Sequence, residues 1–168
     1  MKTKILTAVM SLVLVISVNA CKEKEPLRPI PKTTMPPLTP VSETHVIVPE
    51  NVKDKWSAVK LIVEDKVTKK SREYTINLNS DFKIPNSNLR LYVGEFLPDF
   101  KKDGSILTSA SNNPNNPAVS IRIVEDDRQI FPSLGKKWGW LFAKLPEVHP
   151  VNHPQYAIFL KEGVTKRN

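Results

Sequence analysis

The side chains best suited to metal chemistry are His149 and His153, in a run that reads HPVNHP from residue 149 to residue 154. Two histidines four residues apart share one face of a helix and can hold a metal ion there. The two prolines oppose a helix, because proline lacks a backbone donor and restricts the residue before it. The run therefore predicts a structural His–Pro turn, and binding of a metal ion or haem by these histidines is the alternative hypothesis.

Motifs of known catalytic sites are absent from the sequence. There is no G-x-S-x-G, no H-E-x-x-H and no glycine-rich phosphate loop. Glu125, Asp126 and Asp127 are consecutive at a predicted hairpin tip, where carboxylates are poorly placed for paired acid–base catalysis. We therefore expect no enzymatic activity, no cofactor and no bound metal.

Trp138 and Trp140 are two residues apart and would share one face of a strand. One hypothesis is that they form an aromatic platform for a sugar or for an apolar ligand. The interpretation we favour places both in the core, because residues 138–143 (WGWLFA) are apolar on both faces. Such a segment indicates a central strand that is covered on both sides.

The segment 111–117 reads SNNPNNP and is predicted to be a loop, because asparagine and proline favour turns over regular structure. Its polar side chains join the histidines and one tryptophan as candidates for recognition. The candidate ligand or partner surface comprises His149, His153, Trp138, Asn115 and Asn116.

Cys21, the single cysteine, is the strongest candidate for covalent modification. It follows an apolar run of 14 residues (5–18), which is too short to span a bilayer and is typical of a signal peptide. The sequence VNAC at 18–21 resembles the bacterial lipobox, whose cysteine is acylated and becomes the mature N-terminus. We therefore predict a lipoprotein signal peptide (1–20) and a lipid anchor at Cys21; a secretory signal followed by a free cysteine is the alternative.

Residues 21–49 are predicted to be a tether, because residues 22–49 contain seven prolines and no glycine. This composition favours extended, polyproline-like chain. Lys22 stands where many lipoproteins retained in the inner membrane carry Asp, which predicts the periplasmic face of the outer membrane. An alternative role for the proline-rich run is a ligand for a partner domain.

The chain carries 25 Lys and Arg against 17 Asp and Glu, a net charge of +8. Nucleic-acid binding requires a basic stripe interleaved with stacking aromatic residues. Lys66, Lys69, Lys70 and Arg72 instead cluster around one predicted turn, which indicates a solvated hairpin tip. We expect no nucleic-acid partner, and contact with anionic lipid or an acidic partner is the alternative for this cluster.

Apolar residues recur at every second position after Trp56, and this period is typical of strands with one buried face. Turn-forming residues separate the alternating segments. The pattern predicts an all-β fold, either a single antiparallel β-sandwich or a small, partly open barrel, with seven or eight strands. The domain is predicted to span residues 50–164 with a tail at 165–168, and His45–Val48 could add an edge strand. The alternating segments are 59–63, 74–78, 89–93, 119–123 and 156–160, and the turns lie at 68–71, 85–88, 103–104 and 125–128.

Several short motifs resemble domain-of-unknown-function family 2155, a group of small exported bacterial proteins that includes many lipoproteins. They are VGEFLPDF (93–100), NNPA (115–118), GWLFA (139–143) and HPQY (153–156). The resemblance covers about residues 56–164 and implies an envelope location without a defined activity. The PDF, NPA and GWLFA sequences are also similar to the periplasmic region of ResB-type cytochrome c biogenesis proteins.

These observations predict a non-enzymatic envelope lipoprotein that is held in the membrane by acylated Cys21. Its β-domain would recruit or scaffold an unknown periplasmic protein. Two alternatives belong to other classes. One is an accessory of c-type cytochrome maturation in which His149 and His153 touch haem or metal, and the other is a glycan-binding module that uses Trp138 and Trp140.

Overall fold

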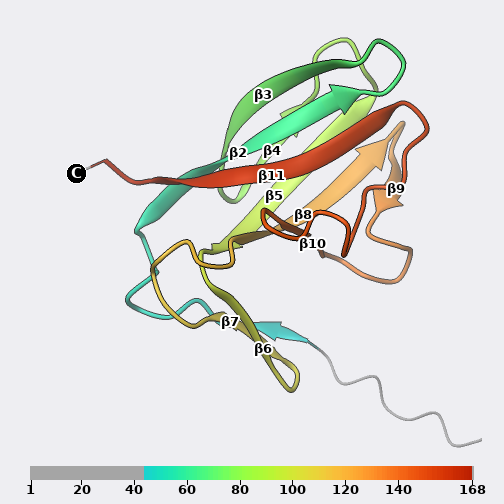
Figure 1. Cartoon of the computed structure of the whole chain (residues 1–168). Helices are drawn as coiled ribbons and strands as arrows, with labels where there is room; N and C mark the ends of the chain where they lie inside the picture. Colours follow the sequence, from blue (N-terminus) through green and yellow to red (C-terminus); the bar gives the residue numbers. More distant parts are fainter. Residues whose placement is uncertain (1–43, 168) are drawn as a thin grey trace, which may run out of the picture. The chain divides into compact units, whose positions relative to one another are not determined.

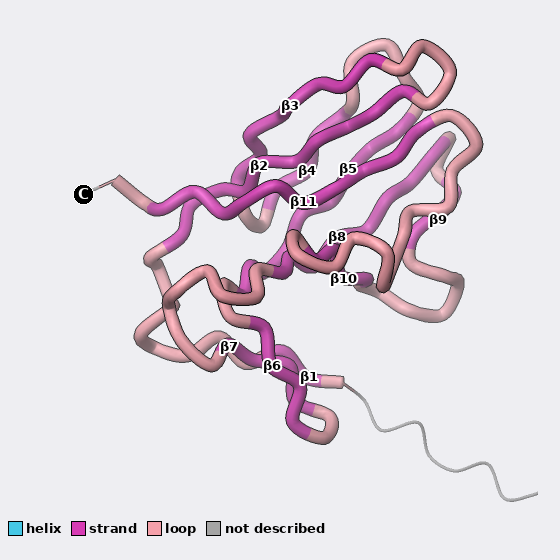
Figure 2. The backbone as a smooth tube through the Cα atoms, viewed as in Figure 1, coloured by secondary structure: helices cyan, strands magenta, loops and turns pink. Residues whose placement is uncertain are grey.

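The computed structural model describes residues 44–167, and Cys21, the predicted signal peptide and most of the predicted tether lie outside these residues. The described residues form strands joined by loops and turns (Figure 2). No helix among them is long and apolar enough to cross a membrane. The strands are β1 (His45–Val46), β2 (Trp56–Asp65), β3 (Lys70–Asn77), β4 (Ser80–Lys83), β5 (Leu89–Leu97), β6 (Phe100–Asp103), β7 (Ile106–Ser109), β8 (Ala118–Glu125), β9 (Arg128–Phe131), β10 (Gly139–Phe142) and β11 (Tyr156–Thr165).

Two antiparallel sheets pack face to face and confirm the predicted all-β sandwich. One sheet has the order β11-β2-β3, and the other has the order β10-β8-β5-β4, with β9 also paired to β8. In Figure 1 the three-stranded sheet lies in front of β4, β5 and β8. The main core cluster draws apolar side chains from both sheets, so the core lies between them.

The predicted alternation identifies the inner faces correctly. Val59 and Leu61 of β2 and Ile121 of β8 are fully buried. The residues between them, such as Lys60 and Arg122, keep part of their surface in water. Burial of these branched side chains stabilises the sandwich by about 1.5–3 kcal/mol each.

A β-bulge in β5 changes which residues face the core. The pairing of β5 with β8 shifts between Val93 and Phe96, so that Val93 pairs with Ile121 and Phe96 pairs with Val119. Side chains alternate across a strand, so the extra residue reverses which positions of β5 face the core after the bulge. The backbone N–H of Glu95, left over in the bulge, donates to Ser120 Oγ at 2.8 Å.

A third, smaller sheet has the order β1-β7-β6, and β1 runs parallel to β7. A second apolar cluster includes Leu107 of β7 together with Trp140 and Phe142 of β10. Both faces of β10 are therefore buried, as predicted. The prediction that β10 is central is wrong, because β10 is the last strand in its sheet's order. Apolar residues on both faces of a strand indicate that other elements cover both faces. They do not indicate whether the strand is paired along both of its edges.

The predicted number of seven or eight strands is also wrong, since the described residues form eleven. Six of the strands, β1, β4, β6, β7, β9 and β10, have only two to four residues. Segments this short leave no readable period of two. The first of them, β1, lies before the predicted domain boundary at residue 50.

Candidate functional site

His153 is buried, and both of its ring nitrogens contact protein atoms. Nδ1 accepts hydrogen bonds from the backbone N–H groups of Gln155 (3.1 Å) and Tyr156 (2.9 Å). Because Nδ1 acts as an acceptor, we assign the ring proton to Nε2, which then donates to Glu125 Oε1 at 3.1 Å. His153 thus joins the start of β11 to the end of β8.

A second turn holds the same segment in place. Asp65 Oδ1 accepts the N–H groups of Val67 (2.8 Å) and Thr68 (2.9 Å), and Lys66 Nζ donates to the His153 carbonyl at 2.7 Å. The Thr68 N–H is the main reason that the pKa of Asp65 lies below its ordinary value. The predicted basic hairpin tip is confirmed between β2 and β3. Within this tip, the side chain of Lys66 makes the internal hydrogen bond to the His153 carbonyl.

We expect His153→Gln to lower the free energy of unfolding by about 2 kcal/mol and His153→Asn to lower it by about 1 kcal/mol. An Asn side-chain oxygen can occupy the position of Nδ1 and keep an acceptor for the two N–H groups, whereas Gln can reach only toward Glu125. Urea denaturation of both variants beside the parent measures the difference. A larger loss of unfolding free energy in His153→Asn than in His153→Gln would contradict the role of Nδ1 as the acceptor of the two N–H groups.

His149 does not meet His153 at a common site. Its side chain is exposed and its ring lies 5.7 Å from that of Phe142. The described part of the chain holds no group of three His, Cys, Asp or Glu side chains that could bind a metal ion. For His153 to bind a metal, one of its present hydrogen bonds would have to break.

The segment 111–117 is the predicted loop, between β7 and β8. Its candidate residues are used in internal contacts: Asn115 Nδ2 donates to Asp99 Oδ2 (3.2 Å) and Asn116 Nδ2 donates to the Phe100 carbonyl (3.0 Å). Ser111 Oγ also donates to Asp99 Oδ2, at 2.8 Å. These amides therefore anchor the loop to the start of β6.

The two candidate tryptophans lie in different environments. Trp140 is 7% exposed and belongs to the second apolar cluster, so the core prediction is confirmed for it. Trp138 precedes β10 and is half-buried. Its ring lies 3.3 Å from the position of a Cβ atom added to Gly94, on the outer face of the five-stranded sheet. The core prediction is not borne out for Trp138, because the residue belongs to neither apolar cluster.

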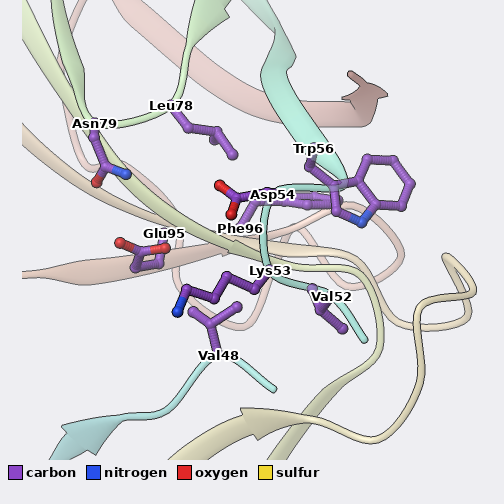
Figure 3. Close-up of a pocket in the computed structure, with 9 residues that line it drawn as sticks. All are labelled: Val48, Val52, Lys53, Asp54, Trp56, Leu78, Asn79, Glu95 and Phe96. Carbon is purple, nitrogen blue, oxygen red and sulfur yellow. The ribbon is translucent and has the colours of Figure 1, made fainter. Parts of the chain in front are cut away.

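An open hollow of about 330 Å³ lies where the 48–54 segment meets β2 and β5 (Figure 3). Trp56 and Phe96 form an aromatic wall, with ring centroids 4.9 Å apart. The indole N–H of Trp56 donates to Asn112 Oδ1 at 2.8 Å, which fixes the ring. The lining residues are Val48, Val52, Lys53, Asp54, Trp56, Leu78, Asn79, Glu95 and Phe96.

The polar residues of this hollow include two carboxylates, those of Asp54 and Glu95. Figure 3 shows the polar ends of these two residues, of Asn79 and of Lys53 around one open space. Lys53 pairs with Glu50 at 3.5 Å, and neither lining carboxylate has an ion-pair partner within 4.0 Å among residues 44–167. The hollow therefore combines an apolar wall with carboxylates that can accept N–H donors.

This hollow could not be predicted from the sequence, because its lining residues come from three separate segments, 48–56, 78–79 and 95–96. Asp54 and Asn79 each adopt a positive φ (58° and 55°), which Asp and Asn tolerate better than most residues. The only local signal is therefore one for turns. The β5 bulge that places Glu95 here depends on pairing with β8.

Comparison of the chain with protein-family models, with curated proteins and with solved structures finds no match. The resemblances to family 2155 and to ResB-type proteins therefore stay predictions. The candidate site is defined by the geometry of this chain alone.

Proposed function

We propose that this chain is a non-enzymatic envelope lipoprotein whose β-domain binds a segment of a partner protein in the hollow beside Trp56. Acylated Cys21 would anchor it in the membrane, and the proline-rich tether would let the domain reach its partner. The periplasmic face of the outer membrane is the proposed location, from the resemblance at residues 18–22.

The observation that carries this proposal is the hollow's combination of an aromatic wall with two carboxylates that lack ion-pair partners within the described chain. A volume of about 330 Å³ is at the lower end of the range for ligand sites and suits one or two side chains. Carboxylates bind the cationic groups of Lys and Arg. The partner segment should therefore carry an apolar side chain next to a basic one.

Cross-linking in living cells tests the proposal. A photoreactive amino acid at Asn79, on the rim of the hollow, should yield one discrete adduct with an envelope protein. The same substitution at Thr75, exposed on β3, is the matched control and should not yield it. Asp54→Asn combined with Glu95→Gln should reduce the adduct several-fold, because both carboxylates lose their charge while Asn tolerates the backbone of residue 54.

The anchor is tested in the same cells. Cys21→Ser should leave the protein unlipidated and move it out of the membrane fraction, since one or more acyl chains supply the membrane affinity. Equal adducts at positions 79 and 75, or an adduct that survives removal of both carboxylates, would contradict a binding role for the hollow. A Cys21→Ser protein that is still processed and membrane-bound would contradict the anchor.

A further inference from the structure

Arg122 occupies the outer face of the five-stranded sheet, away from the hollow. It lies in β8 between the buried Ile121 and Ile123, and it pairs across the strands with Tyr92 of β5. The guanidinium carbon lies 4.1 Å from the centroid of the Tyr92 ring. A cation over an aromatic face is held in place by the ring quadrupole, so this guanidinium is pre-oriented.

One polar atom of Arg122 has no hydrogen-bond partner in the described chain. Its Nε is buried and has no hydrogen-bond partner, and it is the only such side-chain nitrogen or oxygen among residues 44–167. No carboxylate of those residues lies within 4.0 Å of its guanidinium. An unpaired buried donor costs free energy, and a bound ion or water that accepts its hydrogen bond removes that cost.

An aromatic ring lies farther along the same face. A Cβ atom added to Gly94 would press on Ser120, which lies two residues before Arg122 on the same face of β8. Trp138 covers Gly94, so its ring lies on the same outer face as Arg122 and Tyr92. Gln129 Nε2 donates to the Lys136 carbonyl at 2.9 Å and so holds the loop that leads to Trp138.

The local charge favours an anion. Lys83 lies on β4 opposite Arg90 of β5, and Lys136 and Lys137 immediately precede Trp138. Arg90 forms an ion pair with Asp81, so these two charges offset each other. The nearest other carboxylates along β8 belong to its hairpin tip.

Those carboxylates, Asp126 and Asp127, are four and five residues from Arg122. They line a hollow together with Lys83, Arg90 and Tyr92, so this end of the face carries charges of both signs. Trp138 lies away from this hollow, over Gly94. The Arg122 end of the face, next to Trp138, is the favourable end.

We propose that this outer face binds a phosphorylated sugar, with the phosphate on the guanidinium of Arg122 and the sugar ring against Trp138. Arginine presents a planar fork of N–H donors that matches the oxygens of a phosphate. Aromatic rings offer an apolar surface to the C–H face of a sugar. The Nη groups of Arg122, which are not among the fully buried atoms, would donate to the phosphate oxygens.

Calorimetric titration of the full, lipidated chain in non-ionic detergent tests this with three probes: glucose 6-phosphate, inorganic phosphate and glucose. We expect glucose 6-phosphate to bind about 5-fold or more tightly than inorganic phosphate, and glucose alone to show no binding. Arg122→Gln should weaken glucose 6-phosphate binding by about 10-fold or more, because it removes charge-assisted hydrogen bonds. Trp138→Ala should reduce glucose 6-phosphate binding to the level of inorganic phosphate.

Arg72→Gln is the matched control, since it removes the same charge from an exposed position on β3 and should leave binding unchanged. Tyr92→Leu keeps Arg122 but removes the ring beneath it, and it serves if Arg122→Gln fails to fold; it should weaken binding several-fold. Absence of binding by both phosphate probes, or equal binding by the parent and Arg122→Gln, would overturn the proposal. Equal, Arg122-dependent binding of both phosphates would overturn its sugar component.

Discussion

Trp140→Ala should lower the free energy of unfolding by about 3–5 kcal/mol, the largest loss we expect from a single substitution. The side chain is 7% exposed and lies in the second apolar cluster with Leu97, Leu107 and Phe142. Phe100 of β6 packs on it with ring centroids 5.2 Å apart. Removal of the indole leaves a cavity where the small sheet meets β10. Denaturant melts monitored by circular dichroism measure the loss.

Trp138→Ala is the matched control, since it removes the same side chain two residues earlier. Trp138 is half-buried, so we expect a loss of about 1 kcal/mol. Melting of both variants like the parent would contradict the burial of Trp140. Equal large losses would mean that Trp138 also belongs to the core.

Phe96→Ala should cost a similar amount, about 3–5 kcal/mol. Phe96 is 2% exposed and is the first core residue after the β5 bulge, so nearly all of its ring is removed from water. Its ring packs on Trp56 and lies close to Gly163 of β11. Urea denaturation of Phe96→Ala beside Phe96→Leu measures the loss. The Leu variant should retain more than half of the unfolding free energy that Phe96→Ala loses. A loss below about 1 kcal/mol would contradict the burial of this ring.

Gly163 provides an independent check on this packing. A Cβ atom at Gly163 would come within 2.5 Å of the Phe96 ring and 2.8 Å of Trp56. Gly163→Ala alone should therefore destabilise the protein by about 1–3 kcal/mol through overpacking. In the Phe96→Ala background part of this cost should disappear, which a double-mutant cycle detects. Fully additive costs would show that residue 163 does not press on Phe96.

The hollow and the outer face share one strand, β5, but use different residues of it. Glu95 and Phe96 of β5 line the hollow, whereas Tyr92 of β5 supports Arg122 on the outer face. A variant that removes one surface therefore leaves the other intact. The partner-protein and phosphate-sugar proposals can fail independently of each other.

The sequence by itself determined the longer strands and which of their side chains point inward. The period of two in 59–63, 89–93 and 119–123 is local and follows directly from strand geometry. Proline, asparagine and glycine likewise mark the turns at 85–88, 103–104 and 111–117, because their backbone preferences act within a few residues. Burial of Trp140 followed from apolar residues on both faces of its short strand.

The tertiary structure alone decided the features that carry the candidate sites. The pairing of His153 with Glu125, the stacking of Arg122 on Tyr92 and the wall of Trp56 and Phe96 each join residues that are 28 or more apart in the sequence. Such contacts depend on strand register, and one bulge reverses the faces of every residue beyond it. Local sequence patterns do not indicate that register. The hollow beside Trp56 and the outer face at Arg122 therefore could not be predicted without the strand pairing.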